Sequence, residues 1–403
     1  MNFFKRGTIF DTNSIGLGLV ALFILFIGFV ALYSPLLSLY VSLITLCIPV
    51  KKSYIFRFLI SSIIIYSMAV VCASRSIYMA RGDDFLGVYL PLYQYLTHGG
   101  SVFYEDFSGG VEFILPLLFK VMIMIGVSKK VTILTTFLML LLLLFYIWIE
   151  LFFKKSYKNN DKSLVIASIF GFLFFAVISQ QMRQALSTVF LLYYLYFLIK
   201  GFRLLSFFFI VLAFLTHLSA IPIAIILWVI VTGGKKRILL TVAMMLFSWL
   251  FFGILNILTS SSFLGVVAYK FNYYIYNESL SFSSFLYYCP VFILCGFFFK
   301  VDKDTIDERI KGLILYTSIY YIILLPIPLA SDRVLMYGVI FLKGFFVYYC
   351  FKNYIYIYRY VLIAFLCFKL LTMWYITPSP ANGISSFWAD FAPAGDTALY
   401  YFK

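Results

Sequence analysis

The sequence predicts an all-α, polytopic integral membrane protein with about thirteen transmembrane helices. Of its 403 residues, 64% are hydrophobic and 12% are charged, and the mean hydropathy is +1.02. These values lie outside the range of ordinary soluble domains. A spanning helix needs roughly 20 apolar residues to cross a hydrocarbon core of about 30 Å, and such runs recur from Ile15 to Tyr375 without a long soluble interruption. We therefore expect residues 1–403 to form a single polytopic membrane domain.

Each predicted span is an apolar run bounded by charged or turn-forming residues. Pro35 and the region of His217 each divide a long apolar stretch into two short helices. The predicted spans are Ile15–Tyr33, Leu36–Val50, Ile55–Ser74, Val131–Phe153, Ser163–Gln180, Gln184–Ile199, Leu204–Thr216, Leu218–Val231, Ile238–Leu258, Ser283–Phe299, Gly312–Leu329, Val334–Phe351 and Tyr360–Ile376.

The first span is expected to be retained in the mature protein. Lys5 and Arg6 precede an apolar run, as in a signal peptide, but no small-x-small cleavage site follows. The six cysteines of the chain lie in or beside apolar runs without a C-x-x-C spacing. They are therefore interpreted as small core residues, neither a zinc site nor a disulfide framework.

The segment Glu112–Val127 is short for a span and contains Glu112, Pro116 and Lys120. Treating it as a crossing would place the lysines that follow the next span on the outer side of the membrane. We therefore predict a peripheral or re-entrant helix on the outer face.

Basic residues set the predicted orientation. With a cytoplasmic N-terminus, most of the 31 lysines and arginines fall on the cytoplasmic side, in clusters such as Lys51-Lys52 and Lys235-Lys236-Arg237, as the positive-inside rule requires. The same distribution explains the net charge of +15 better than nucleic-acid binding does, because the basic clusters alternate with apolar runs.

Three longer segments then face the outer side: a loop at about 75–130, a second loop at about 259–282 and a C-terminal tail at about 377–403. Most acidic residues and both histidines of the chain fall on this side. The inner side is left with short turns rich in lysine. We therefore expect the functional groups to face the extracytoplasmic side.

The first candidate group is a polar stripe. Gln180, Arg183, Gln184 and Ser187 are spaced i, i+3, i+4 and i+7, so they share one face if the helix continues across Gln181. Polar side chains in a membrane normally turn toward a bundle interior or a wet cavity. The alternative is an arginine whose stem extends toward the headgroups.

His217 is the second candidate, in Thr216-His217-Leu218-Ser219 at the predicted break between two short helices. A single histidine in such a place is more often a satisfied core residue than a catalyst. Broken helices in membranes, however, occur only where protein or water satisfies the freed backbone groups. His217 therefore stays a candidate for proton transfer.

Two further candidates are charged pairs. Asp332-Arg333 could be an interfacial ion pair in a tight turn, or it could supply a guanidinium for phosphate oxygens. Asp83 and Asp84 could hold a metal, act as a base or lie in a solvated loop, and the same alternatives apply to Glu112. A site is the preferred interpretation for Asp84 or Glu112, and a solvated loop for Asp83.

Several function classes are excluded by missing motifs. The chain has no P-loop, no dinucleotide fingerprint and no H-E-x-x-H sequence, and Thr232-Gly233-Gly234-Lys235 is explained as a basic cytoplasmic turn. Chemistry driven by soluble nucleotides is therefore not expected.

Short motifs in a fixed order connect these candidates. They are Gly82-Asp83-Asp84 with Tyr89, Glu112-Phe113, Arg183-Gln184-Ala185-Leu186, His217-Leu218-Ser219-Ala220, and Asp332-Arg333 with Tyr337. In this order the chain resembles the EpsG-like branch of the Wzy-type polysaccharide polymerases, over about Arg75 to Tyr337. The most informative part is the pair of Arg-Gln-Ala and His-x-Ser-Ala motifs.

The resemblance implies a GT-C-like membrane glycosyltransferase of the bacterial inner membrane with its active face in the periplasm. Such an enzyme transfers a growing O-antigen or capsule chain from undecaprenyl pyrophosphate to a lipid-linked repeat unit, with membrane lipids and a chain-length regulator protein as further partners. The catalytic candidates are His217, Asp84 and Glu112. Pyrophosphate and sugar would be bound by Arg183, Gln184, Arg333, Asp332 and Tyr337. No metal or cofactor is expected.

Two other functions are compatible with such a chain. A lipid-linked oligosaccharide flippase or transporter would also be polytopic, and Lys343, in the middle of a predicted span, is the feature that favours it. An O-antigen ligase would need the same phosphate-binding arginine and outward sugar cavity. A structural subunit without chemistry would have fewer polar residues at helix breaks.

Overall fold

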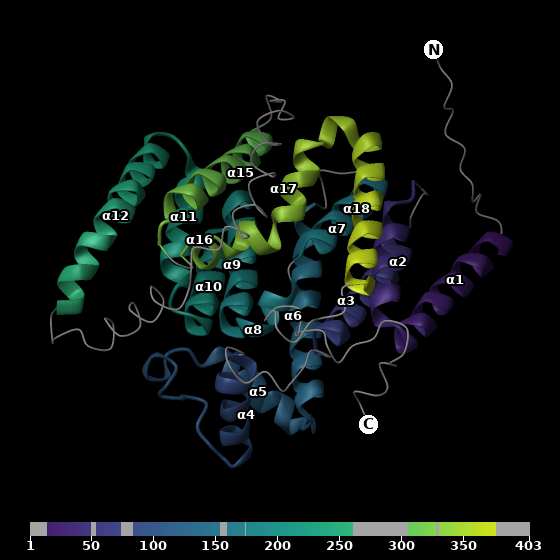
Figure 1. Ribbon diagram of the computed structural model, residues 1–403, viewed down its shortest axis with the longest axis horizontal. Helices are drawn as coiled ribbons and strands as arrows, with labels where there is room; N and C mark the ends of the chain where they lie inside the picture. Colours follow the sequence, from purple (N-terminus) through teal and green to yellow (C-terminus); the bar gives the residue numbers. More distant parts are fainter. Residues whose placement is uncertain are drawn as a thin grey trace. The chain divides into compact units, whose positions relative to one another are not determined.

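The computed structural model describes residues 14–49, 54–73, 84–153, 159–173, 175–260, 305–327 and 330–375. All regular elements in these ranges are helices, as Figure 1 shows, and no strand occurs among them. The predicted all-α class is therefore confirmed for the part of the chain that is described. The predicted span Ser283–Phe299, the predicted loop at about 259–282 beyond Ser260, the tail at about 377–403 and Asp83 lie outside these residues.

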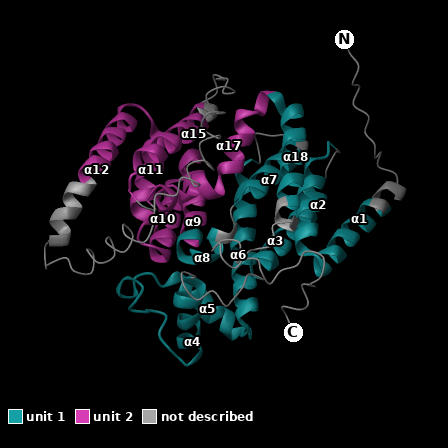
Figure 2. Cartoon of the chain, viewed as in Figure 1, with its two compact units in different colours: residues 1–185, 354–403 teal, residues 186–353 magenta. Residues whose placement is uncertain are grey.

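The chain divides into two compact units, coloured separately in Figure 2. Unit 1 comprises residues 1–185 and 354–403, and unit 2 comprises residues 186–353. Unit 1 is thus assembled from the two ends of the chain, whereas unit 2 is one continuous stretch.

Helix α2 packs against α1, α3, α7 and α18 of unit 1, and α6 packs against α3. Pro35 is the first residue of α2, where a missing backbone N–H is no loss, so the predicted division of the first apolar stretch at Pro35 is confirmed. The helices of unit 1 are α1 (Ser14–Tyr33), α2 (Pro35–Cys47), α3 (Tyr54–Ala73), α4 (Leu90–Thr97), α5 (Ile114–Met124), α6 (Lys130–Phe152), α7 (Asn159–Phe172), α8 (Phe175–Gln180), α18 (Ile355–Tyr375) and the short η1 (Phe85–Tyr89) and η2 (Ser108–Gly110).

Unit 2 is built around α11 and α15, which pack against each other and against α12. Helix α9 (Met182–Lys200) begins in unit 1 and provides the first helix of unit 2. The other elements of unit 2 are α10 (Arg203–Thr216), α11 (Ala220–Thr232), α12 (Lys235–Ser260), α15 (Thr305–Leu324), α16 (Ala330–Val334), η4 (Tyr337–Phe341), α17 (Lys343–Cys350) and η5 (Lys352–Tyr354), which joins the two units.

Four helices among the described residues are long and apolar enough to cross a membrane. They are Tyr54–Ala73, Lys130–Phe152, Met182–Lys200 and Lys352–Leu371. Five shorter apolar helices of 10 to 17 residues accompany them. The protein is therefore a helical membrane protein, while the number of thirteen spans stays a prediction.

Two predicted spans are interrupted in the structure. Ser163–Gln180 is divided between α7 and α8, because α7 ends at Phe172 and α8 begins at Phe175. Val334–Phe351 is divided among α16, the π-helix η4 and α17. In η4 the N–H of Leu342 donates to the carbonyl of Tyr337, 2.9 Å away, so this turn is one residue wider than an α-helical turn. Apolar composition carries no signal for such a local widening.

Gly338 in η4 allows a close approach between η4 and α15. A Cβ at this position would lie 2.5 Å from Cγ2 of Thr317 and 3.2 Å from the Phe346 ring. Thr317 is buried and its hydroxyl lies 3.1 Å from that of Tyr337. The β-branched side chain therefore has little freedom to move aside.

We expect Gly338→Ala to lower the free energy of unfolding by about 1 to 3 kcal/mol through overpacking. Thermal unfolding in detergent would measure the change. Gly28→Ala is the matched control, because a Cβ there would meet only Ile63 Cδ1 at 4.0 Å. Equal midpoints for the two variants would contradict the steric explanation.

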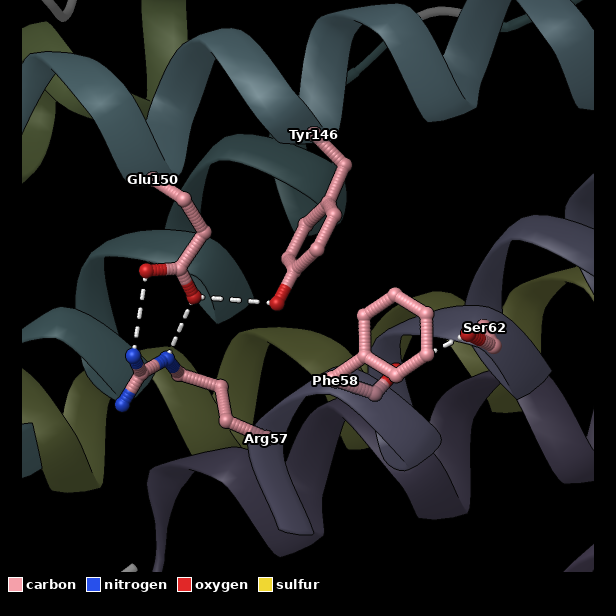
Figure 3. A network of polar contacts seen from close by, with 5 residues as sticks. All are labelled: Arg57, Phe58, Ser62, Tyr146 and Glu150. Atoms are coloured by element: carbon pink, nitrogen blue, oxygen red, sulfur yellow. Dashed lines mark hydrogen bonds and ion pairs between the residues drawn. The ribbon is translucent and has the colours of Figure 1, made fainter. Parts of the chain in front are cut away.

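An ion pair connects α3 with α6 inside unit 1 (Figure 3). The Arg57 guanidinium binds the Glu150 carboxylate in a bidentate manner. Its Nε donates to Oε1 at 2.6 Å and its Nη2 donates to Oε2 at 3.0 Å. Tyr146 donates to the same carboxylate at 2.9 Å. The side chains of Arg57 and Glu150 are only 2% and 13% exposed. Arg57 lies near the start of α3 and Glu150 near the end of α6, so these packed helices run antiparallel.

The structure also describes the segment Glu112–Val127, which the sequence predicts not to cross the membrane. The segment contains a single helix, α5, of 11 residues, which extends roughly 16 Å at 1.5 Å per residue. This length is about half of a hydrocarbon core of about 30 Å. The length of α5 is compatible with a peripheral or re-entrant helix, and its position relative to the membrane stays a prediction.

Helices α7 and α18 of unit 1 run parallel. The Ser168 hydroxyl is hydrogen-bonded to that of Tyr358, and further along both helices the rings of Phe172 and Phe365 stack with centroids 4.5 Å apart. Lys369 donates to the carbonyl of Gly171 at 3.0 Å, close to the end of α7. The lysine thereby binds a backbone carbonyl where the regular helix stops.

Candidate functional site

An ion pair between Arg183 and Glu112 in unit 1 joins two of the sequence motifs. Nη1 of Arg183 donates to Oε2 of Glu112 over 2.5 Å. The Glu112 side chain is 2% exposed and that of Arg183 is 22% exposed. Arg183 is the second residue of α9, and Glu112 lies two residues before α5 begins. The pair therefore joins two helix beginnings that are 71 positions apart in the sequence.

Phe107 and Ser108 hold the two members of this pair separately. The guanidinium carbon of Arg183 lies 3.8 Å from the centroid of the Phe107 ring, within the range of a cation–π interaction. The Ser108 hydroxyl donates to Oε1 of Glu112 at 3.2 Å. Arg183 thus keeps an aromatic contact and Glu112 a hydrogen bond that do not depend on the ion pair.

A tight turn in the backbone brings Phe107 next to Glu112. Ser108, Gly109 and Gly110 all have positive φ, at 54°, 67° and 85°, a region that glycine adopts at little cost. The turn is closed by hydrogen bonds from the N–H groups of Gly110 and Glu112 to the carbonyl of Phe107. Ser108 is the single residue other than glycine with positive φ in the described part of the chain, which marks this turn as conformationally demanding.

Tyr89 covers the start of α9 in the same cluster. Its hydroxyl accepts the backbone N–H of Arg183 at 3.5 Å, and its ring makes an edge contact with Phe107. Burial raises the pKa of the Tyr89 phenol above its ordinary value. The nearby charge of Arg183 lowers this pKa in part, and the charge of Asp84 raises it further. Tyr89 is therefore a neutral hydroxyl at physiological pH. Asp84, half-buried just before η1, lies close enough to influence it.

Arg183 retains hydrogen-bonding capacity beyond its contact with Glu112. Its Nε is buried and has no hydrogen-bond partner among the described residues. A buried guanidinium nitrogen without a partner is costly, and phosphate oxygens fit the guanidinium fork in a bidentate manner. Arg183 is therefore the member of this cluster whose chemistry suits an anion with several oxygens.

The predicted polar stripe around Arg183 is only partly observed. Helices α8 and α9 are separated at Gln181, although the N–H of Gln181 and that of Ala185 both keep i−4 bonds. Gln184 is buried. Ser187, in unit 2, donates to the carbonyl of Ala213 at 3.0 Å. Ser187 therefore contributes to the packing of α9 on α10.

The candidates in unit 2 are described separately from this cluster. His217 is half-buried and ends α10 in an extended conformation (φ −160°, ψ 127°), and α11 begins three residues later. The predicted helix break is thus confirmed. The Ser219 hydroxyl at this break is buried and without a hydrogen-bond partner among the described residues.

Asp332, Arg333 and Tyr337 follow one another on α16 and η4. Asp332 accepts a hydrogen bond from the Tyr321 hydroxyl at 3.5 Å, and both Asp332 and Arg333 are half-buried. Tyr337 is fully buried, with its hydroxyl paired to Thr317. Its position is that of a core residue of unit 2.

Of the predicted site residues, the structure brings together Glu112 and Arg183, with Gln184 adjacent and Asp84 close to Tyr89. Phe107 and Ser108 were not predicted from the sequence. The Ser-Gly-Gly sequence at 108–110, a turn signal close before Glu112, was the available indication. Among the described residues, no group of three or more histidine, cysteine, aspartate or glutamate side chains could hold a metal ion.

Comparison with known families gives one finding. The model of the EpsG family matches residues 58–388, a range that includes every motif discussed above. Neither the curated proteins nor the solved structures provide a significant match.

Proposed function

Because the chain belongs to the EpsG family, we propose that this membrane protein is a polysaccharide polymerase. It would transfer a growing O-antigen or capsule glycan from undecaprenyl pyrophosphate to a lipid-linked repeat unit, at the periplasmic face of the bacterial inner membrane. The family is associated with polysaccharide synthesis and with glycosyltransferase-like polymerases. The observation that supports the proposal is the Arg183 cluster. In it, Glu112 and Phe107 fix the position of a guanidinium, a group that suits an anion with several oxygens.

In this reaction a hydroxyl oxygen of the acceptor sugar forms a bond to the anomeric carbon of the donor. The bond from that carbon to the pyrophosphate oxygen breaks, and undecaprenyl pyrophosphate leaves with the electron pair. Negative charge therefore develops on the leaving pyrophosphate, where a fixed cation is most effective. We assign Arg183 the role of neutralising the leaving pyrophosphate. Arg333 of unit 2 is the second proposed cation.

The acceptor hydroxyl must also lose its proton. His217 is the first proposed acceptor of that proton, with Asp84 and Glu112 as alternatives. His217 lies at a confirmed helix break, whereas Glu112 is engaged by Arg183 and Ser108. Tyr337, buried in unit 2, would act only by supporting its neighbours Asp332 and Arg333.

The test is glycan banding on a gel from cells that carry a deletion of this protein. The deletion is expected to leave the single-repeat product, and wild-type protein is expected to restore the ladder. Arg183→Ala and His217→Ala, expressed at the wild-type level, are expected to fail. An unchanged ladder in the deletion would rule out a polymerase.

Lys343 favours one alternative from a different class. It is buried as the first residue of α17, directly after the interruption at η4, and charged groups beside broken helices are typical of transporters. Loss of even the single-repeat product in the deletion strain would indicate a flippase or a ligase in place of a polymerase.

A further inference from the structure

Glu112 makes the contact with Arg183 that a pyrophosphate oxygen would make. Carboxylate and phosphate oxygens are both anionic acceptors for a guanidinium, and both form short, charge-assisted hydrogen bonds with it. The Arg183 to Glu112 contact of 2.5 Å is of this kind. A pyrophosphate that approaches Nη1 of Arg183 must therefore compete with the Glu112 carboxylate.

Arg183 and Glu112 each have a second contact that can hold the side chain in place when the ion pair between them is broken. Arg183 rests on the Phe107 ring at 3.8 Å, and this contact does not involve Glu112. The Glu112 carboxylate keeps the hydrogen bond from Ser108, 3.2 Å away, on its other oxygen. Each member thus has its own anchor, and both anchors lie on the turn at 107–108.

We propose that Glu112 is an internal competitor for the pyrophosphate site: the donor's pyrophosphate displaces it from Arg183, and its return helps to release undecaprenyl pyrophosphate after transfer. This inference rests on the proposed function, because it assumes that Arg183 binds the pyrophosphate. It assigns Glu112 a role in affinity and product release that does not require it to accept a proton.

Competition of this type changes substrate and product binding together. The carboxylate weakens both by a similar amount, which raises KM but shortens the lifetime of the bound product. Release of product limits turnover in many enzymes. Removal of the competing carboxylate should therefore give a protein that binds pyrophosphate more tightly and turns over more slowly after its first cycle.

The experiment measures binding of farnesyl diphosphate, a short polyprenyl diphosphate, to the purified full-length protein in lipid nanodiscs by titration calorimetry. Glu112→Gln is expected to bind about tenfold more tightly than wild type, a difference of about 1.4 kcal/mol. Arg183→Ala is expected to lose binding. Glu105→Gln is the matched control, since Glu105 is exposed in the same loop, and should bind like wild type.

The outcomes separate this inference from the proposed function. Unchanged or weaker binding by Glu112→Gln, together with lost binding by Arg183→Ala, would overturn the competitor role and leave the pyrophosphate site in place. Full binding by Arg183→Ala would overturn both. If Glu112→Gln does not fold, Glu112→Asp keeps the charge and shortens the reach by one methylene, and it should also bind more tightly than wild type.

Discussion

Arg183→Ala should reduce polymer formation by about 100-fold or more, the usual consequence of losing one group that stabilises charge in a transition state. The guanidinium is held by Glu112 and by the Phe107 ring, so alanine removes a cation that is fixed in place before substrate binds. The rate of ladder formation from lipid-linked repeat units in membrane vesicles would measure the effect.

Arg183→Lys provides the sharper comparison. A lysine keeps the charge but replaces a planar fork with a point charge, so we expect activity between that of alanine and that of wild type. Arg203→Ala is the matched control, because Arg203 is an exposed arginine at the start of α10. Wild-type rates in both Arg183 variants would exclude Arg183 from the pyrophosphate site.

Arg57→Ala should have the largest effect on stability, a loss of about 3 to 5 kcal/mol in the free energy of unfolding. Values of this size are typical when one partner of a buried ion pair is removed and the other is left unpaired. Glu150 would then keep only the Tyr146 hydroxyl as partner within the network of Figure 3. The unfolding midpoint in detergent, measured against wild type, tests this expectation.

The double variant Arg57→Leu/Glu150→Leu distinguishes a charge effect from a packing effect. Two apolar side chains of similar size leave no buried charge, and such replacements are often neutral or stabilising. We therefore expect the double variant to be more stable than either single leucine variant. A double variant as unstable as the sum of the two singles would show that volume, not charge, governs this position.

Much of the helical order could be predicted from apolar runs alone. The predicted topology has α3 and α6 crossing in opposite directions and α7 and α18 in the same direction, and the contacts of Arg57 with Glu150 and of Ser168 with Tyr358 have these directions. In unit 2 the predicted antiparallel pairing of α9 with α10 agrees with the bond from Ser187 to Ala213. Hydropathy and charge distribution determine such directions because each crossing reverses the chain.

The interruptions could be predicted only where the sequence has a strong local signal. Pro35 marks a real helix start, and the polar residues around His217 mark a real break. The break after Phe172 lies within an apolar run, and the wide turn at Tyr337–Phe341 lies within a predicted span whose residues do not indicate its exact position. The turn at Tyr337–Phe341 accompanies a close approach to Thr317 at Gly338, a tertiary contact that the sequence alone does not indicate.

The sequence indicated which residues are candidates for the site, but it did not indicate which of them contact one another. Arg183 and Glu112 were both expected to be functional, yet nothing in the sequence joins two positions 71 residues apart. Phe107 is one of 48 phenylalanines, so its role under Arg183 could not be distinguished from packing. Tyr337 was assigned to the substrate site through the family resemblance, and the structure places it on the π-helical turn, buried in unit 2.

The division of unit 1 between the two ends of the chain imposes an order on biosynthesis. During translation the helices up to α8 enter the membrane first, followed by the whole of unit 2, and α18 emerges last. Until then Ser168 lacks Tyr358 and the carbonyl of Gly171 lacks Lys369. The early part of unit 1 therefore lies in the bilayer without these two contacts between α7 and α18 while roughly half of the protein is still being synthesised.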